Sequence, residues 1–360
     1  MSRKLNVINN IITIIFTVVV SYICFAFCVG KFNKQLLELA LPLVLGLILV
    51  SFLQTFFHEL GHLFFGKLNG FVLISFRVWF VKFYRRKNKI KTCFSKLNDA
   101  AGATEMVAKN SNNLLKRFKS MTFGGLLFSF LSMLLGLIAI FVDMPYWLAC
   151  IIILFLPVGC YSVLGNLLTI EEYGYKNDGA TLLGLKKQDD NSKIIVGLLN
   201  IQSQLFNGKT PSEIDQNFYF DLPQLPEDNS NFLSLLIFRY YYYLDKGDYA
   251  EALKIIQRLL TLEMYMTKDM QMGVKTEALY MYSAHFRDEQ KVDDLMYELE
   301  DYLNKNNTAS VVRAKLAYIL FIGEENADVN LFYKKGIKEA KKCPILGLKN
   351  FEIKLLDKLK

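Results

Sequence analysis

The stretch "QTFFHELGHLFFGK", Gln54 to Lys67, places two histidines and a glutamate inside one of the most apolar parts of the chain. An ionisable side chain costs roughly 2–3 kcal/mol or more at the centre of a bilayer, so such residues indicate a function. Within the pentapeptide "HELGH", His58 and His62 are four residues apart. Both imidazoles therefore lie on one face of a helix and can bind one ion.

The chemistry of this pentapeptide favours zinc. Zinc accepts imidazole nitrogens and lowers the pKa of a bound water to about 7. Glu59 lies beside the two histidines, where its carboxylate can take a proton from such a water. The alternative is a chance match. With only three histidines in the chain, a chance pair at this spacing is rare, and it would more often fall in water-soluble sequence than in an apolar run. The sequence predicts one Zn²⁺ bound by His58 and His62, with Glu59 as the general base.

The 360-residue chain is 52% hydrophobic, and its apolar residues gather before residue 171. Four runs there carry no charge: 7–30, 39–57, 120–142 and 144–170. Each has at least about 19 residues, which suffices for a helix to cross the hydrocarbon core. We therefore expect four membrane spans near 7–30, 37–66, 120–142 and 145–170.

The charge distribution predicts the orientation of these spans. Thirteen Lys or Arg residues and only two acids lie between Lys67 and Lys119, so this segment is expected on the cytoplasmic side. Both termini are then cytoplasmic. The remainder of the chain is slightly acidic despite a total charge of +8, which argues against a nucleic-acid partner. Six scattered cysteines form no CxxC pair, and no structural disulfide is expected.

The segment 71–108 is rich in β-branched and aromatic residues, which predicts a hairpin or small sheet at the membrane surface. Residues 207–231 look like a linker because they hold three prolines among polar residues. From Phe232 onward three helical pairs recur about every 40 residues, a period typical of helical solenoids. The first pair, with "GDYAEAL" at 247–253, resembles a tetratricopeptide repeat. His285, on one of these helices, is expected to be structural.

A family resemblance covers about residues 40–185. The segments "HELGH", "FVLISFRVWF", "GATEMV", "FGGLLFSF" and "GNLLTIEEYGYKNDGATLL" stand in the order of the site-2 protease family of intramembrane zinc metalloproteases. In that family an HExxH helix precedes a small membrane-associated sheet and a glycine-containing core span. A later span carries asparagine and an Asp-Gly whose aspartate is the third zinc ligand.

The resemblance implies that Asp178 joins His58 and His62 as a zinc ligand and that Glu59 is catalytic. From its residues alone, "NDG" is more often a turn than a ligand, and Glu171 and Glu172 remain competitors for the third position. Asn166 has two readings that stay open. It either donates a hydrogen bond to the substrate or oxyanion, or it caps a helix end.

Together these features predict a mainly α-helical fold of three parts: a transmembrane metalloprotease domain at 1–188, a helix and linker at 189–231, and a cytosolic α-helical repeat domain at 232–360. The expected protein is a multi-pass enzyme of the cell membrane. Its expected activity is endopeptidase cleavage of membrane-spanning or membrane-bound proteins or peptides. The edge of the 71–83 strand is expected to hold an unwound substrate segment. A protein partner is expected for the repeats. The alternative is a non-catalytic membrane-anchored adaptor that presents the repeats.

Overall fold

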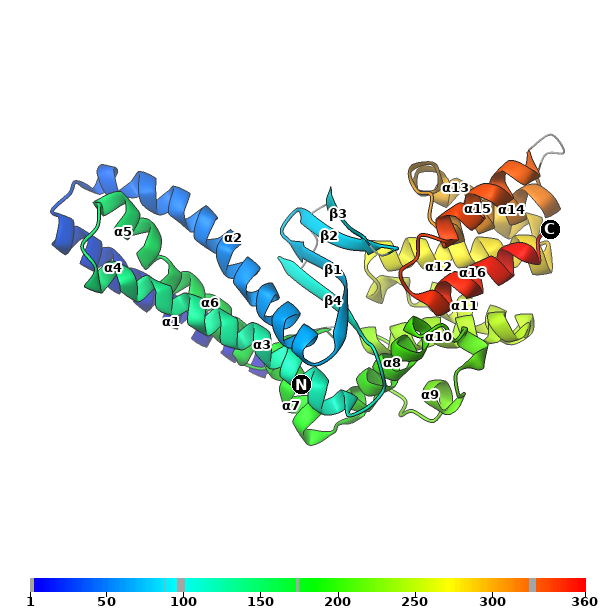
Figure 1. The fold of residues 1–360 in the computed structure, drawn as a ribbon, viewed down its shortest axis with the longest axis horizontal. Coiled ribbons are helices and arrows are strands. Elements are labelled where there is room, and N and C mark those ends of the chain that lie inside the picture. The colour runs from blue at the N-terminus through cyan, green and yellow to red at the C-terminus, as the bar shows by residue number, and fades with distance from the viewer. Residues whose placement is uncertain (1–2, 88, 96–100, 173–174, 324–327) are drawn as a thin grey trace. The chain divides into compact units, whose positions relative to one another are not determined.

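The computed structural model describes residues 3–87, 89–95, 101–172, 175–323 and 328–360. The chain is mainly helical, with a small sheet, and it divides into two compact units (Figure 1). Unit 1 comprises residues 1–85, 90–107 and 113–189, and unit 2 comprises 86–89, 108–112 and 190–360. Each unit is described by itself below.

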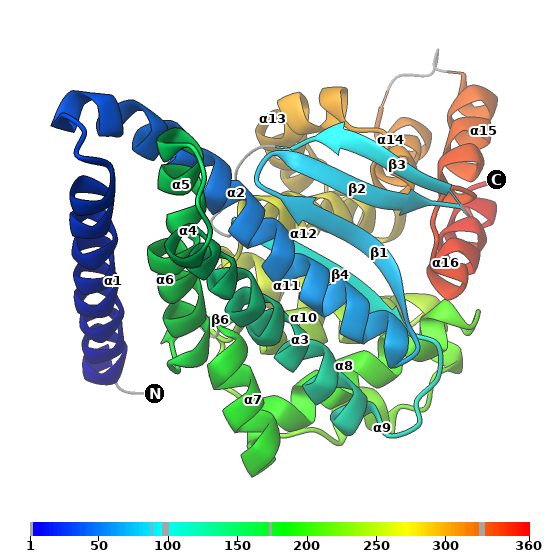
Figure 2. The same ribbon diagram turned by 60° about the vertical axis from the view of Figure 1, so that its left-hand side comes forward.

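Four helical segments of unit 1 are long and apolar enough to cross a membrane: 4–32, 36–68, 114–141 and 146–167. The first two are the helices α1 (Arg3–Phe32) and α2 (Leu36–Leu68). Helix α1 exposes large apolar side chains along most of its length, such as Tyr22, and α2 does so mainly in its N-terminal half, as at Leu41. Exposed apolar surface of this kind is expected of helices that contact lipid. Helix α1 packs mainly along α6 (Phe155–Leu167) (Figure 2).

The other two segments are not continuous α-helices. The third consists of α3 (Leu114–Leu134), a 3₁₀ turn at Leu135–Leu137 and α4 (Ile138–Phe141). The fourth is broken at Leu154 into α5 (Tyr146–Ile153) and α6. Pro157 accounts for this break, because its ring lacks an N–H and clashes with the carbonyl four residues earlier.

The segment after α2 forms a four-stranded antiparallel sheet of β1 (Phe71–Val78), β2 (Val81–Arg86), β3 (Lys89–Phe94) and β4 (Gly102–Ala108). The strand order is β3-β2-β1-β4. The expectation that the 71–83 strand offers a free edge is therefore wrong. A tight turn at Trp79 splits that segment into β1 and β2, and β1 pairs on both sides.

Glycines bring α3 directly against α2. A Cβ on Gly61 of α2 would lie 2.2 Å from the backbone oxygen of Gly124, and one on Gly124 would lie 2.5 Å from the oxygen of Gly61. Only residues without a side chain permit so close a crossing. The crossing falls within the HELGH turn, so it brings the backbone of α3 beside the two histidines.

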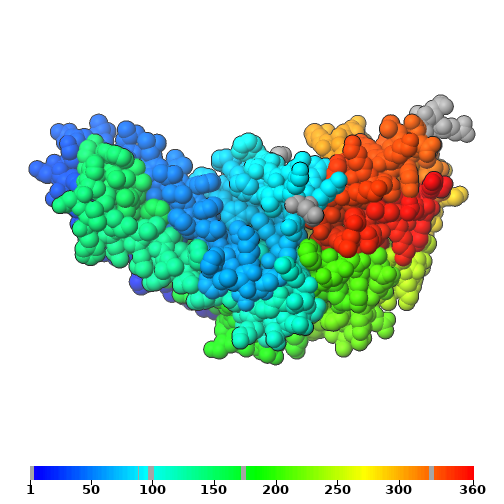
Figure 3. Space-filling model, viewed as in Figure 1, coloured from blue at the N-terminus to red at the C-terminus, as the bar shows by residue number. Residues whose placement is uncertain are grey.

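Residues 168–189 complete unit 1. They form the short strands β5 (Glu171–Glu172) and β6 (Tyr175–Lys176), which pair antiparallel, and then α7 (Asp178–Lys187). The unit ends at Asp189. Figure 3 shows the outer side chains of its helices in blue to green and of its sheet in cyan.

Unit 2 is helical throughout its described C-terminal part. It begins with α8 (Asp190–Phe206) and α9 (Asn217–Phe220). Residues 207–231, expected as a linker, are part of this unit, because Ile214 and Tyr219 are buried in its core. The remaining helices are α10 (Ser230–Lys246), α11 (Tyr249–Thr261), α12 (Lys268–Met281), α13 (Glu289–Lys305), α14 (Ala309–Phe321), α15 (Val329–Ala340) and α16 (Leu346–Asp357).

The second helix of each pair, α11, α13 and α15, begins with the same device. Asp248, Asp288 and Asp328 precede these helices at intervals of 40 residues. Each carboxylate accepts a hydrogen bond from the backbone N–H three residues later. Such N-caps satisfy a backbone donor that the helix itself leaves without a partner. The recurring aspartates thus account for where the second helix of each pair begins.

Candidate metal centre

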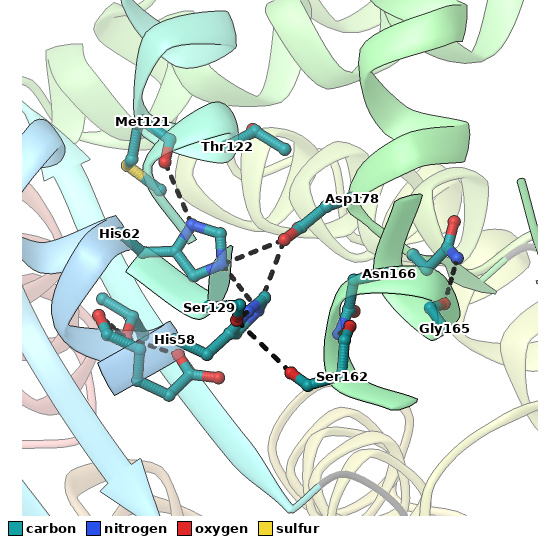
Figure 4. Close-up of polar contacts among 12 residues, drawn as sticks. His58, His62, Met121, Thr122, Ser129, Ser162, Gly165, Asn166 and Asp178 are labelled. Atoms are coloured by element: carbon teal, nitrogen blue, oxygen red, sulfur yellow. Dashed lines mark hydrogen bonds and ion pairs between the residues drawn. The ribbon is translucent and has the colours of Figure 1, made fainter. Parts of the chain in front are cut away.

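Three side chains from two helices converge in unit 1 (Figure 4). His58 and His62 come from α2, and Asp178 is the first residue of α7. Asp178 Oδ2 lies 3.3 Å from Nε2 of His58 and 3.3 Å from Nε2 of His62, and the two nitrogens are 3.1 Å apart. They form a group of donors that could hold a metal ion.

The spacing of these donors fits a four-coordinate ion. Zinc bonds of 2.0–2.1 Å at tetrahedral angles place neighbouring ligand atoms about 3.3 Å apart. The Oδ2 atom of Asp178 is buried and has no hydrogen-bond partner among the described residues. A buried anionic oxygen without a donor is costly unless a cation compensates its charge. The donor set of two imidazoles and a carboxylate is one that zinc accepts.

The opposite ring nitrogens fix the orientation of both imidazoles. His62 Nδ1 lies 3.0 Å from the backbone oxygen of Met121, and His58 Nδ1 lies 2.9 Å from Ser129 Oγ. The carbonyl of Met121 can only accept, so Nδ1 of His62 carries the proton and Nε2 presents its lone pair. Both partners belong to α3, which therefore orients the histidines of α2 as partners of metal-binding imidazoles do.

Further polar contacts hold α3 in register with α2. Gln54, one turn before His58, donates to the backbone oxygen of Ser129 at 3.2 Å and accepts from Ser132 Oγ at 2.8 Å. Gln54, Ser129 and Ser132 are all buried. Their pairing offsets the cost of polar groups inside an apolar helix pair.

Asp178 is held in place by its two neighbours in the sequence. The side chain of Asn177 donates to the backbone oxygens of Gly165 and Leu168 and accepts from the N–H of Ala180, which caps α7. A Cβ on Gly179 would lie 2.0 Å from the backbone oxygen of Leu167, so α7 can approach the end of α6 only with glycine there. The "NDG" sequence therefore fastens the end of α6 to the beginning of α7.

Asp178 carries the negative charge of the group. Burial would raise the pKa of its carboxyl, but His58 and His62, where their rings are protonated and can donate to it, outweigh burial and lower this pKa to about 2. Its place in the first turn of α7 adds the favourable field of a helix N-terminus. The carboxyl is therefore ionised at neutral pH and can serve as an anionic ligand.

Glu59 turns away from α3 toward the sheet. Its buried carboxylate accepts a hydrogen bond of 2.6 Å from the hydroxyl of Thr104 on β4. Its Oε1 atom lies where a side chain on Gly102 would be, only 2.5 Å from the position of a Cβ. Strand β4 thus holds one carboxylate oxygen and leaves room for the other.

A cavity of about 780 Å³ reaches the group of donors. It is lined by His58 and Glu59, by Asn166 and Ser162 of α6, and by Asn10 of α1, among others. The amide of Asn166 donates to the oxygen of Ser162 within its own helix. Asn166 lies at the cavity wall. Its hydrogen bond to Ser162 gives no support to the interpretation of Asn166 as a cap of a helix end.

Two other residues that the sequence singles out lie elsewhere. The carboxylate of Glu171 lies 3.7 Å from Lys176 Nζ and is not among the converging donors. The side chain of Glu172 lies outside the described part of the chain. In unit 2, His285 stacks on Tyr249 with ring centroids 3.7 Å apart, and burial is the main reason that its pKa falls to about 4.

Comparison of the chain with protein-family models, with curated proteins and with solved structures finds no match. The function is therefore inferred from the chemistry of the converging side chains.

Sequence reasoning missed the residues that support the donors and Glu59: Gln54, Thr104, Ser129 and Asn177. For Gln54 and Ser129 a signal exists, because each is a polar residue within an uncharged apolar run. Met121 gives no such signal, because only its backbone oxygen takes part.

Proposed function

We propose that the chain is a zinc-dependent intramembrane endopeptidase similar to the site-2 proteases. The observation that carries this proposal is the convergence of three donor atoms within 3.3 Å of one another, beside a cavity that is lined by one of them, His58, and by Glu59. A purely structural ion would not require an acid beside the histidines at the cavity. Catalytic zinc sites have three protein ligands and leave the fourth position to water or substrate.

The residues divide the chemistry among them. His58, His62 and Asp178 would hold one Zn²⁺, which supplies a Lewis acid that activates water and polarises a peptide carbonyl. Glu59 accepts the proton of the attacking water and passes it to the leaving nitrogen. Thr104 keeps the carboxylate of Glu59 in one orientation during both transfers. Asn166, at the cavity wall, would donate to the substrate.

The cavity favours a substrate that comes from the bilayer. A second, almost entirely apolar cavity of about 430 Å³ is also lined by α1, α2 and α6, and shares Ser51, Val158 and Tyr161 with the first. An apolar segment fits this neighbouring space, while the polar cavity receives a peptide bond. A helical substrate must unwind there, since a helix hides its carbonyls in hydrogen bonds.

Unit 2 supports a role in binding a protein partner or the tail of a substrate. Its helix pairs recur at 40-residue intervals, and stacked helix pairs present extended peptide-binding surfaces. The alternative is an adaptor that anchors this unit to the membrane without catalysis. Glu59 separates the two, because an adaptor has no use for a general base.

The test compares Glu59→Gln with the parent protein. The full chain is purified from membranes, its zinc content is measured, and both forms are incubated with a panel of single-span substrates. We expect equal zinc in both, and cleavage by the parent that falls by about 10²–10⁴-fold in the variant, as for loss of a general base. His58→Ala serves as the control that loses zinc. Equal cleavage by parent and Glu59→Gln would refute the mechanism, and zinc without cleavage in either would favour the adaptor.

A further inference from the structure

Helix α1 carries none of the three donors. Polar residues near its N-terminal end nevertheless bind the protein backbone rather than face outward. Asn9 is buried, and its amide donates to the backbone oxygen of Thr169 at 2.8 Å. Asn6, one turn earlier, donates to the backbone oxygen of Glu171 and accepts from the N–H of the same residue at 3.3 Å. Asn6 thus binds one backbone unit through both atoms of its amide, as a neighbouring strand would.

The backbone that Asn6 and Asn9 bind is the segment that leads to the third donor. Ile170, between the two bound residues, accepts from the N–H of Asn177 at 3.1 Å and donates to its side chain at 3.2 Å. Asn177 directly precedes Asp178. The path from α1 to the carboxylate therefore consists of hydrogen bonds to residues 169–171, two hydrogen bonds to Asn177 and one peptide bond.

This path adds to the hydrogen bonds by which Asn177 holds the end of α6. Between the end of α6 at Leu167 and Asp178, the described regular structure consists of two strands of two residues each. Short strands of this kind are not stable by themselves. Polar side chains on an apolar helix are costly, and hydrogen bonds to the backbone of Thr169 and Glu171 offset that cost here.

We infer that α1 is a positioning element of the metal centre: Asn6 and Asn9 hold residues 169–171 so that Asp178 meets His58 and His62. This inference rests on the metal centre proposed above, but not on the peptidase activity. It gives the first helix a role beyond anchoring. Neither asparagine touches the donors, so their effect on metal binding is indirect.

The experiment measures metal binding by the full-length protein carrying Asn6→Ala and Asn9→Ala together. Zinc affinity is obtained by competition with a chromophoric chelator, and Co²⁺ bound in place of zinc reports the ligand geometry through its visible absorption bands. We expect zinc affinity to fall by about 10–100-fold, the usual effect of removing residues that orient a ligand, and the Co²⁺ bands to shift.

Two further variants separate positioning from general damage. Lys4→Ala removes an exposed polar side chain from the same end of α1, away from the cavity, and it should leave zinc affinity and the Co²⁺ bands unchanged. Asn6→Gln with Asn9→Gln keeps both amides one methylene further out, and it should recover part of the affinity. Single-species elution of every variant checks that the helices remain assembled.

The inference is overturned if the double alanine variant binds zinc as tightly as the parent with the same Co²⁺ bands, or if Lys4→Ala weakens binding equally. These outcomes are independent of the peptidase proposal, which would still stand if Glu59→Gln abolished cleavage. Conversely, zinc lost from the double variant and no cleavage by the parent would sustain the inference and refute the peptidase. A parent that binds neither Zn²⁺ nor Co²⁺ would refute the metal centre itself.

Discussion

Gly125 on α3 faces the two imidazoles so closely that a methyl group has no room there. A Cβ at this position would lie 2.3 Å from His62 Nε2 and 3.0 Å from His58 Cε1. Because the Nδ1 atoms of both rings are hydrogen-bonded to α3, the rings cannot turn aside without losing those hydrogen bonds. The positions of the two imidazoles therefore require glycine at residue 125.

Gly125→Ala should abolish or greatly weaken zinc binding, by at least about 10–100-fold, because the added methyl displaces His62 Nε2. Zinc bound per purified protein measures this directly. Gly30→Ala is the matched control, since a Cβ at Gly30 of α1 meets nothing within 4 Å. Zinc bound equally well by Gly125→Ala would show that the rings do not occupy the positions described.

The histidines and Glu59 could be singled out from sequence because their chemistry is local to one helical turn. Asp178 could be named only through a resemblance, since 115 residues separate it from the nearest histidine in the chain and no local pattern marks it. The hydrogen bonds of Ser129 and Met121 depend on how α3 crosses α2. That crossing is set by glycines whose partners only the folded chain reveals.

At the scale of elements, the runs without charge located the four long apolar segments well, because composition alone marks them. Pro157, Gly159 and Gly165 in the fourth run indicate a kink or partial unwinding, and the structure breaks that run at Leu154. The turn at Trp79 escaped, since aromatic residues occur in both continuous and interrupted strands. The recurring helix pairs of unit 2 were visible in the sequence, but their packing was not.

Three of those helices meet at one buried guanidinium. Arg313 of α14 is fully buried and donates to Glu277 of α12 at 2.8 Å and to Glu352 of α16 at 3.0 Å. Its guanidinium lies over the ring of Tyr280, 4.0 Å from the centroid. The carboxylates satisfy a charge that otherwise would be very costly in the core.

Arg313→Met should lower the free energy of unfolding of unit 2 by about 3–5 kcal/mol, because it leaves two buried carboxylates without their partner. Denaturant unfolding followed by a signal from this unit measures the loss. Lys305→Met is the control, since Lys305 and its partner Asp301 are largely exposed and such pairs contribute less than about 1 kcal/mol. Similar losses for both variants would contradict the role assigned to the buried cluster.

At the scale of the whole molecule, the distribution of basic residues predicts which side of the membrane each segment faces. The segment between Lys67 and Lys119 carries a large positive excess, and it includes Cys93, an exposed residue of β3. The turn between α4 and α5 holds Asp143, whose side chain is fully exposed. The positive-inside rule places these two residues on opposite sides of the membrane.

Membrane-impermeant maleimide should therefore label Cys93 only after the cells are opened, in a background with Cys160 and Cys343 replaced by alanine. Asp143→Cys, added to a background that also lacks Cys93, should be labelled in intact cells. Mass spectrometry of the labelled protein gives the extent of reaction. Labelling of Cys93 in intact cells would reverse the orientation proposed here.

The close approach of two imidazole nitrogens and a carboxylate oxygen affects when the protein binds its ion and how fast it releases it. Three electron-rich atoms within 3.3 Å of one another repel unless a positive charge lies between them. This group of donors should bind its ion early, while the chain is inserted and its helices assemble. It should release the ion slowly afterwards. A chelator added during biosynthesis should then be far more damaging than the same chelator added to the finished protein.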